Sequence, residues 1–373
     1  MKVPYFLPWI NNADKKNVLK ALENRWLTNG PILKKFESNF QRYINVNYSA
    51  GVGSATQALH LSLNVLGIGK GDEVIVPTFT FAATANSALY CRAKPVFVDV
   101  DENSFNISIN EIIKKISKKT KAIIAVHYGG QACDMEDLSQ ICKEHDLFLI
   151  EDCAHSLGST YKNKFCGSFG SLGCFSFYPT KIITTGEGGM VTTNSSKLNK
   201  KIRLLRSQAM NIEAKDREKK SKWKYDVVDL GYNYRLDEIR ASLGNSQLER
   251  IELINKKRLN VAKKYDSKLK KIKGISIPKI EKNRNHIFHL YTIKVEKDYH
   301  LTRNQLFKKL SKAGIGTSVQ YTPLHLMSYY KKILKINNDN FPNTNKIKDQ
   351  IICLPIFPTM NSKMIDYVVK NLN

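Results

Sequence analysis

The sequence predicts an α/β protein in which helices flank a mostly parallel central sheet, with a smaller α/β domain at the C-terminal end. Two observations support this fold class. From about residue 52 to residue 194, short apolar strand patterns alternate with helical patterns, an order typical of helices packed on a mostly parallel sheet. A second, shorter set of patterns begins near residue 255. We therefore expect a large domain over residues 1–254 and a small domain over residues 255–373.

The elements of the large domain follow from the spacing of apolar residues and from the residues that interrupt it. Residues 55–69 have helical spacing and end at glycines, and residues 71–80 form a strand pattern that stops at a proline. The next patterns predict a valine-rich strand at 94–101, a buried strand at 120–130 before a Gly-Gly turn, an amphipathic helix at 135–146 and a buried strand at 147–156.

Helical patterns connect the two predicted domains. The segment 196–224 predicts a helix followed by an exposed loop. The segment 230–269 begins with an aromatic, polar turn and becomes one long helical pattern. In the small domain, the patterns predict a strand at 286–295 and helices at 302–314 and 364–373.

The composition is that of a packed globular chain with a strong positive charge. Hydrophobic residues make up 42% of the chain, and 59 Lys and Arg against 33 Asp and Glu give a formal net charge of +26. Such a charge favours nucleic acid, a membrane surface or an anionic substrate as partner. The basic residues are spread along the chain without a nucleic-acid recognition motif, so most are expected on solvated helix faces. A substrate that carries a diphosphate is compatible with this charge.

The N-terminus and the cysteines predict a cytoplasmic protein without a metal. The first residues carry no signal-peptide pattern, and no apolar run reaches the ~20 residues of a membrane span. The seven cysteines are scattered and form no CxxC pair, so we expect reduced, buried thiols and neither a disulfide framework nor a zinc site. We expect no nucleic-acid partner and no membrane association.

Unusual polar residues follow three predicted strands, at 77–81, 127–131 and 151–155. Because the carboxyl ends of parallel strands meet at one edge of a sheet, these stretches predict the functional site. Asp152 ends an apolar run, and alone it could be a helix cap, a metal ligand or a partner for a cationic cofactor nitrogen, with a cap as the default. His155, taken alone, is more typical of a buried structural histidine.

A second group of residues predicts an anion site beside a reactive lysine. Ser54–Thr56 precedes a helical pattern, where free N–H groups and the helix dipole attract an anion, although Ser and Thr are also ordinary N-caps. Lys181 lies between an apolar run and a glycine-rich turn, and Ser176 precedes it. With Asp152, these residues supply what pyridoxal phosphate needs: a lysine for its aldehyde, a carboxylate for its ring nitrogen and donors for its phosphate.

The chain resembles the sugar aminotransferases of the DegT/DnrJ/EryC1/StrS family, a branch of the aspartate aminotransferase fold. The resemblance covers nearly the whole chain, and its most specific parts are SFxxxKxxxxGEGG at 176–189 and EDxAH at 151–155. It implies a fold type I transferase with pyridoxal 5′-phosphate as cofactor. It also implies a homodimer whose active sites are shared between subunits.

The resemblance implies a role for each matching residue. Lys181 binds the cofactor aldehyde and then moves a proton between the cofactor carbon and the sugar carbon, and Asp152 pairs with the pyridinium nitrogen. Further cofactor contacts are implied for Ala55, Thr56 and Ser176 at the phosphate, Phe81 on the ring face, Gln131 at the hydroxyl, His155 near the ring and Asn233 from the neighbouring subunit. Substrate contacts are implied for Thr28, Asn29, Arg235 and His325. For Arg235, an exposed arginine at a helix start is the competing interpretation.

The implied reaction transfers an amino group from L-glutamate to a nucleotide-linked keto-deoxysugar. The segments 222–235 and 314–330 are most similar to enzymes that aminate the 4-keto position of a UDP-linked 6-deoxy sugar. Amination at a 3-keto position, or of a GDP- or dTDP-linked sugar, is the alternative. A non-catalytic regulator or binding protein with this fold, and a basic nucleic-acid binder, belong to other classes, and the complete lysine, aspartate and serine set argues against them.

Two departures from the family pattern lie outside the predicted cofactor residues. Gln208 and Ala209 replace the usual His-Gly pair, and Gln320 replaces a usual histidine. One subfamily carries histidine in place of the catalytic lysine and performs dehydration. Because Lys181 is present, we expect transamination.

Overall fold

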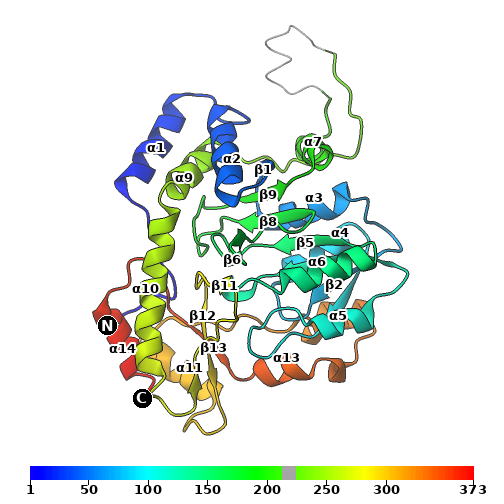
Figure 1. Ribbon diagram of the computed structural model, residues 1–373. Coiled ribbons are helices and arrows are strands. Elements are labelled where there is room, and N and C mark those ends of the chain that lie inside the picture. The colour runs from blue at the N-terminus through cyan, green and yellow to red at the C-terminus, as the bar shows by residue number, and fades with distance from the viewer. Residues whose placement is uncertain (212–223) are drawn as a thin grey trace.

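The computed structural model describes residues 1–211 and 224–373, and a seven-stranded sheet forms its centre (Figure 1). The strand order is β1-β9-β8-β5-β4-β2-β3. The strands are β1 (Tyr48–Val52), β2 (Glu73–Pro77), β3 (Lys94–Val98), β4 (Thr120–Val126), β5 (Phe148–Asp152), β8 (Leu172–Ser176) and β9 (Gly189–Thr193). Neighbours from β8 to β3 pair in parallel, and β9 pairs antiparallel with β1 and β8. The predicted α/β fold with a mostly parallel sheet is confirmed.

Helices cover both faces of this sheet because its strands are apolar on both sides. Ile75 and Ile123 belong to one buried cluster, while their neighbours Val74 and Ile124 belong to the other. The first cluster is completed by α2 (Pro31–Ile44), α5 (Ile109–Lys115), α6 (Met135–Glu144) and α9 (Glu238–Leu248). The second is completed by α3 (Ala55–Val65), α4 (Ala82–Tyr90) and α7 (Ser196–Leu205).

The predicted helix at 55–69 and the predicted strand at 71–80 correspond to α3 and β2. Ser54 caps α3 by accepting a hydrogen bond from the Gln57 N–H, and the chain turns after the helix at Gly67, whose φ is +78°. The helix predicted from residue 196 corresponds to α7. Most of the exposed loop predicted after it lies outside the described residues.

The single long helical pattern predicted after residue 235 is wrong in one respect. It forms two helices, α9 and α10 (Ile251–Leu269), separated at Arg250, whose φ of −119° is not helical. The Arg250 Nη2 donates to the Trp9 carbonyl and to Asp14 Oδ2, both at 2.6 Å. At this break the chain binds both α1 (Asn12–Glu23), through Asp14, and the segment before it, through Trp9.

A second, antiparallel sheet lies beside α10 (Figure 1). It consists of β10 (Ile275–Ser276), β12 (Tyr291–Val295) and β13 (Ile351–Leu354), packed with α11 (Arg303–Lys312) and α14 (Ser362–Lys370). The strand and the two helices predicted for this part of the chain correspond to β12, α11 and α14. Val3 enters the same core and pairs with Ile315, so both chain ends meet here. The division at residue 254 remains our proposal.

Part of the C-terminal half returns to the large sheet. The Leu324 N–H donates to the Thr78 carbonyl at 2.8 Å, after the end of β2. The following helices, α12 (Ser328–Ile333) and α13 (Pro342–Ile347), place Tyr330 in the core under α4 and bind Asp99 through the Thr344 N–H at 3.0 Å. The segment before them therefore reaches the edge of the sheet where the polar stretches lie.

Three short strands form a further sheet, β6 (Thr160–Tyr161), β7 (Lys164–Phe165) and β11 (Arg284–Asn285). All seven cysteines are unpaired, and six of them are buried. Among the described residues, no helix combines the length and the apolar character that a membrane span requires.

Candidate active site

The polar stretches that follow β2, β4 and β5 lie at one edge of the sheet. These strands are parallel neighbours, and Val126 at the end of β4 pairs with Asp152 at the end of β5. The segments that follow them are therefore close in space. This edge holds the candidate site.

Asp152 is a buried carboxylate with two hydrogen-bond donors. Its Oδ2 accepts from Thr84 Oγ1 at 2.9 Å, and its Oδ1 accepts from the Ala154 N–H at 3.1 Å. Burial raises the pKa of Asp152, while these two bonds and the positive charge of Lys181 act in the opposite direction. A buried carboxylate of this kind is stabilised by a cationic partner in the site.

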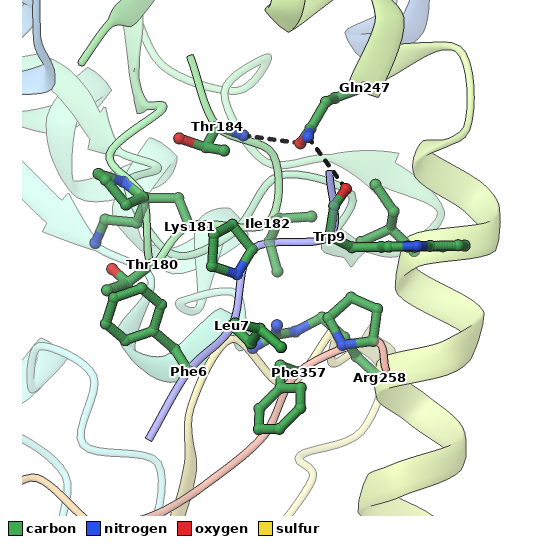
Figure 2. Close-up of a pocket in the computed structure, with 14 residues that line it drawn as sticks. Phe6, Leu7, Trp9, Thr180, Lys181, Ile182, Thr184, Gln247, Arg258 and Phe357 are labelled. Atoms are coloured by element: carbon green, nitrogen blue, oxygen red, sulfur yellow. Dashed lines mark hydrogen bonds between the residues drawn. The ribbon is translucent and has the colours of Figure 1, made fainter. Parts of the chain in front are cut away.

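Lys181 follows β8 in a loop whose position is fixed by the Gln247 side chain. The Gln247 side chain accepts from the Thr184 N–H at 3.1 Å and donates to the Trp9 carbonyl at 3.4 Å. Figure 2 shows this clamp and shows the Lys181 side chain extending away from the pocket that the clamp borders. Burial lowers the pKa of Lys181 to about 8, although the negative charge of Asp152 partly opposes this shift. A lysine with this pKa can act as a nucleophile near neutral pH.

An anion cradle lies between α3 and β8. Ser54 caps α3, which leaves the N–H groups of Ala55 and Thr56 without helical partners. Ser176 pairs with Gly189 between β8 and β9. A Cβ on Gly189 would lie 2.6–2.8 Å from backbone atoms of Ser54 and Ala55, so only glycine lets the helix start approach Ser176 so closely. The dipole and free N–H groups of this helix start suit a phosphate.

His155 is buried beside these residues and packs against two aromatic rings. Its Nδ1 lies 3.3 Å from the Gly129 N–H, and its Nε2 lies 2.8 Å from the Tyr321 hydroxyl. Its ring stacks on Tyr321 and lies 4.3 Å from the ring of His289. Burial and the charge of Lys181 hold the pKa of His155 well below its usual value, so the ring is neutral.

Phe81 and Gln131 differ in their exposure and in the contacts that their side chains already make. Phe81 precedes α4 and its side chain is 61% exposed, with its ring 6.1 Å from that of Tyr321. Gln131 is buried, its Nε2 donates to the Lys279 carbonyl at 3.1 Å, and its Oε1 accepts from the Glu281 N–H at 2.7 Å. Phe81 is thus available to a ligand, whereas each end of the Gln131 amide already makes one hydrogen bond and one Nε2 hydrogen stays free among the described residues. The Gln131 contact to the cofactor hydroxyl stays a prediction.

The residues predicted to meet the substrate come from two segments that pair with each other. The backbone of Thr28 pairs with Asp237, and that of Arg235 pairs with Val52, just before the cradle. Asn29 has a φ of +50°, and its Oδ1 is buried without a hydrogen-bond partner among the described residues. This orphaned oxygen is suited to a ligand donor.

Asn233 lies at the start of this paired segment, with an exposed side chain and its backbone paired with Ser207. An exposed side chain is compatible with contact to a neighbouring subunit, which stays a prediction.

His325 occupies a structural position. Its ring is fully buried and stacks on Phe341, its Nδ1 lies 2.8 Å from Thr78 Oγ1, and its Nε2 lies 3.2 Å from Asn345 Oδ1. Both ring nitrogens are used to hold the segment after α11 to the end of β2. Contact between His325 and substrate stays a prediction.

Gln208 and Ala209, which depart from the family pattern, both have positive φ, at +68° and +51°. Ala209 is buried in the core beneath α7, and a Cβ on Gly231 would lie 2.1 Å from its nitrogen. These residues therefore support the segment that leads to Asn233 and Arg235.

Two residues that hold the site were missed by the sequence analysis. Thr84 donates to Asp152, and its position one helical turn after Phe81 is a local signal that could have indicated it. Glu238 accepts from the N–H groups of Gly30, Ile32 and Leu33 and so fixes the loop that carries Asn29. Because its partners lie more than 200 residues away, no local pattern indicates this role.

A cluster of potential metal ligands lies behind the site and is satisfied without a metal. His127, Glu151 and Cys153 are buried with ligand atoms within 4.8 Å of one another. The Glu151 carboxylate binds His127 at 3.1 Å and accepts three backbone N–H groups from residues 167–170. This hydrogen bonding gives the cluster a structural role.

The donor set fits pyridoxal phosphate. The structure offers a lysine with a lowered pKa, a buried carboxylate beside it, an anion cradle at the start of α3 and an exposed aromatic ring at the start of α4. These parts match the aldehyde, the ring nitrogen, the phosphate and the ring face of that cofactor. The fold and the site together define the class of pyridoxal-phosphate-dependent transferases.

The chain belongs to the DegT/DnrJ/EryC1/StrS aminotransferase family, whose model matches residues 8–373. It is 37% identical to the UDP-4-amino-4,6-dideoxy-N-acetyl-beta-L-altrosamine transaminase of Campylobacter jejuni, over 97% of this chain and 94% of the relative. It is 38% identical to the GDP-perosamine synthase of Caulobacter vibrioides, over 87% of this chain and 85% of that relative. Among solved structures, it is similar to the putative sugar aminotransferase Spr1654 of Streptococcus pneumoniae in its PMP form, with 30% sequence identity and a TM-score of 0.94. The match covers 100% of this chain and 98% of the solved chain. The protein is a pyridoxal-phosphate-dependent sugar aminotransferase.

Proposed function

We propose that the protein transfers the amino group of L-glutamate to the ketone of a nucleotide-linked 4-keto-6-deoxy sugar, with a UDP-linked sugar as the first choice. The observation that carries this proposal is Lys181, with its pKa lowered to about 8, beside the buried Asp152 and the cradle at α3. Two relatives are named for amino sugars linked to UDP or GDP. The product would be a 4-amino sugar.

Different residues of this chain would bind the phosphate, the ring face and the ring nitrogen of the cofactor. The N–H groups of Ala55 and Thr56 and the hydroxyl of Ser176 bind the cofactor phosphate, and Phe81 packs on its ring. Asp152, held by Thr84, keeps the ring nitrogen protonated. The bound cofactor then supplies an electron-accepting ring that stabilises negative charge on the carbon next to the transferred nitrogen.

Lys181 has two tasks in this proposal. Its Nζ would hold the cofactor, and the same Nζ, when free, would carry the proton between the substrate carbon and the cofactor carbon. Burial favours both tasks because it keeps a fraction of the amine unprotonated. The replacement of this residue by histidine in a dehydrating subfamily gives a further reason to propose transamination here.

Substrate recognition would use both subunits of a homodimer. Thr28, Asn29 and His325 are the proposed contacts to the sugar within one subunit, and Asn233 of the neighbouring copy would reach the phosphate of the cofactor. Arg235, which has no ion pair among the described residues, would bind the substrate diphosphate. We propose a cytoplasmic location, where soluble nucleotide sugars are supplied.

A substrate panel tests the nucleotide and the position of amination. The protein would be incubated with L-glutamate and with UDP-, GDP- and dTDP-linked keto sugars that carry the ketone at position 3 or 4, and the products would be analysed. We expect the highest kcat/KM for a UDP-linked 4-keto-6-deoxy sugar. A preference of tenfold or more for another member would replace this substrate proposal, tenfold being about 1.4 kcal/mol of transition-state discrimination.

A further inference from the structure

A buried arginine close to the site carries a charge that no acidic side chain balances. Arg258 lies in α10 and is 4% exposed. Its Nε donates to the Phe288 carbonyl at 3.1 Å, and its Nη2 donates to the His289 carbonyl at 2.7 Å. Within residues 1–211 and 224–373, no Asp or Glu forms an ion pair with it. Arginines are almost never fully buried without a charged partner, so Arg258 is an exception.

The acidic group that acts on the charge of Arg258 is a phenol that stays neutral. Burial lowers the pKa of Arg258 to about 10, and Tyr5 partly opposes this shift. Burial also raises the pKa of Tyr5 well above its usual value, so Tyr5 supplies no negative charge. At neutral pH the guanidinium is therefore a buried cation without a counter-ion. A bound anion would offset the cost of burying that charge.

Arg258 lines two small pockets, and both include Thr180, the residue before Lys181. Figure 2 shows the first pocket, into which Arg258 extends from α10. In the second, which we call the Arg258 pocket, the arginine and Thr180 are joined by polar groups of Tyr5, His289 and Gln320 and by apolar groups of Phe6, Leu290 and Ile356. The Arg258 pocket therefore adjoins the loop that carries the reactive lysine.

A second buried group of the Arg258 pocket also lacks a partner. His289 is 4% exposed, and its Nδ1 is buried without a hydrogen-bond partner among the described residues. Burial, together with the charges of His155, Lys181 and Arg258, holds the pKa of His289 well below its usual value, so the ring is neutral. A neutral imidazole can carry its proton on Nδ1 and donate it to a ligand. The His289 ring lies 4.3 Å from that of His155, which places this pocket beside the site.

The shape and the size of the Arg258 pocket favour a carboxylate. A planar guanidinium matches the two oxygens of a carboxylate, and a small pocket has no room for a diphosphate. We propose that Arg258 binds a carboxylate of the amino donor, with His289 as a second donor beside it. This inference rests on the proposed function, which supplies L-glutamate as the donor. Because the keto sugar brings its negative charge as a diphosphate, Arg258 serves the glutamate half of the reaction.

The test compares the two halves of the reaction in wild type and Arg258→Met, both loaded with cofactor. The rate at which L-glutamate bleaches the visible band gives the donor concentration for half-maximal rate. We expect Arg258→Met to raise this concentration about tenfold or more, as the loss of hydrogen bonds from a charged donor implies. The KM of the nucleotide keto sugar should stay as in wild type. An unchanged glutamate dependence, or an equal loss for both substrates, would overturn the inference.

Glutarate separates binding from reaction, because it has two carboxylates and no amine. Calorimetry of the cofactor-loaded protein should show glutarate binding that Arg258→Met weakens about tenfold or more. Inorganic phosphate is the competing probe. If phosphate binds more tightly than glutarate and Arg258→Met abolishes the phosphate binding, the arginine serves a phosphate group and the inference is wrong.

Gln320→Glu tests the pocket without removing the bonds of Arg258 to the two carbonyls. Gln320 Nε2 donates to the Tyr5 hydroxyl at 3.1 Å, and a glutamate oxygen can accept from that hydroxyl instead. The new carboxylate is a counter-ion for Arg258 inside the protein and repels a second carboxylate. We expect glutarate to bind this variant about tenfold more weakly than wild type. Unchanged glutarate affinity would contradict the inference even if Arg258→Met fails to fold.

Arg250→Met is the matched control. Arg250 immediately precedes α10, is partly buried and lines neither pocket, and its charge is paired with Asp14 at 2.6 Å. We expect this variant to lower the free energy of unfolding and to keep the glutarate affinity of wild type. Weakening equal to that in Arg258→Met would show a general effect and contradict the inference. A wild-type protein whose visible band L-glutamate does not bleach would instead contradict the proposed function.

Discussion

At the residue scale, the chemistry depends on the environment of one lysine. At pH 7 a lysine with a pKa of about 8 has about a tenth of its amine unprotonated, compared with roughly one part in a few thousand for a solvated lysine. Burial produces this increase in the unprotonated fraction, and Asp152 limits the increase by stabilising the ammonium form. Of the 59 basic residues, Lys181 is distinguished by its position after β8 and beside this carboxylate.

The first prediction is the pH dependence of cofactor capture. The rate at which the apoprotein forms the visible band with pyridoxal phosphate should rise with pH and level off with a midpoint near 8, because only the free amine of Lys181 reacts. Asp152→Asn should move this midpoint lower, since the carboxylate raises the pKa of the lysine. Stopped-flow absorbance measures both. A midpoint near the pKa of an ordinary lysine would show that burial does not lower the pKa of Lys181.

Several residue roles could be predicted from the sequence and others could not. Lys181, Asp152 and Ser176 lie in motifs with local spacing, so the sequence alone proposes them as site residues, and their roles stay predictions. Glu238 carries no such signal, because its contacts with the N–H groups of Gly30, Ile32 and Leu33 form only after folding.

At the element scale, the anion cradle depends on how closely β9 approaches the start of α3. Gly189 separates Ser176 from the backbone of Ser54 and Ala55, and no side chain fits there. Two of the glycines that follow Lys181 are required for different reasons. Gly186 has a φ of +79° with open space around it, whereas Gly189 is limited by contact.

The second prediction compares these two glycines. Gly189→Ala should displace the helix start and weaken cofactor binding about tenfold or more, because hydrogen bonds to a charged phosphate are each worth about 1.5–3 kcal/mol. Gly186→Ala should cost about 1 kcal/mol in the free energy of unfolding through its left-handed backbone, with cofactor affinity unchanged. Titration of the apoprotein and denaturant unfolding give the two quantities. Equal affinities for the two variants would contradict the role given to Gly189.

Element prediction succeeded where the pattern was local and failed where distant contacts decided. The apolar strands and capped helices of the large sheet follow from their own sequences. The break between α9 and α10 does not, because Arg250 leaves the helix to bind Trp9 and Asp14, more than 200 residues earlier. The antiparallel direction of β9 is likewise a property of the folded sheet.

At the scale of the whole molecule, the site gathers residues from distant parts of the chain. Glu238 binds the Gly30 N–H next to Asn29, and His155 from the large sheet meets Tyr321 from the C-terminal half. The proposed Asn233 contact adds a second subunit. Domain assignment from sequence cannot show such contacts, because they join segments that only the fold brings together.

The third prediction tests whether two subunits share each site. Lys181→Ala and Asn233→Ala should each reduce activity strongly. When the two variants are mixed and allowed to exchange subunits, one site of each mixed dimer has both residues intact. Activity should return to roughly a quarter of wild type, as random reassortment of a two-fold symmetric dimer predicts. No recovery, despite subunit exchange confirmed by mass spectrometry, would place Asn233 within its own subunit's site or outside the chemistry.

The central claim is that Lys181 holds pyridoxal phosphate and transfers an amino group. The most direct measurement is the absorbance spectrum of the purified protein with added pyridoxal phosphate, before and after L-glutamate. We predict a visible band that glutamate bleaches in wild type, and no such protein-linked band in Lys181→Ala. A wild-type protein that stays colourless with the cofactor, or a Lys181→Ala variant with the wild-type band, would contradict the account.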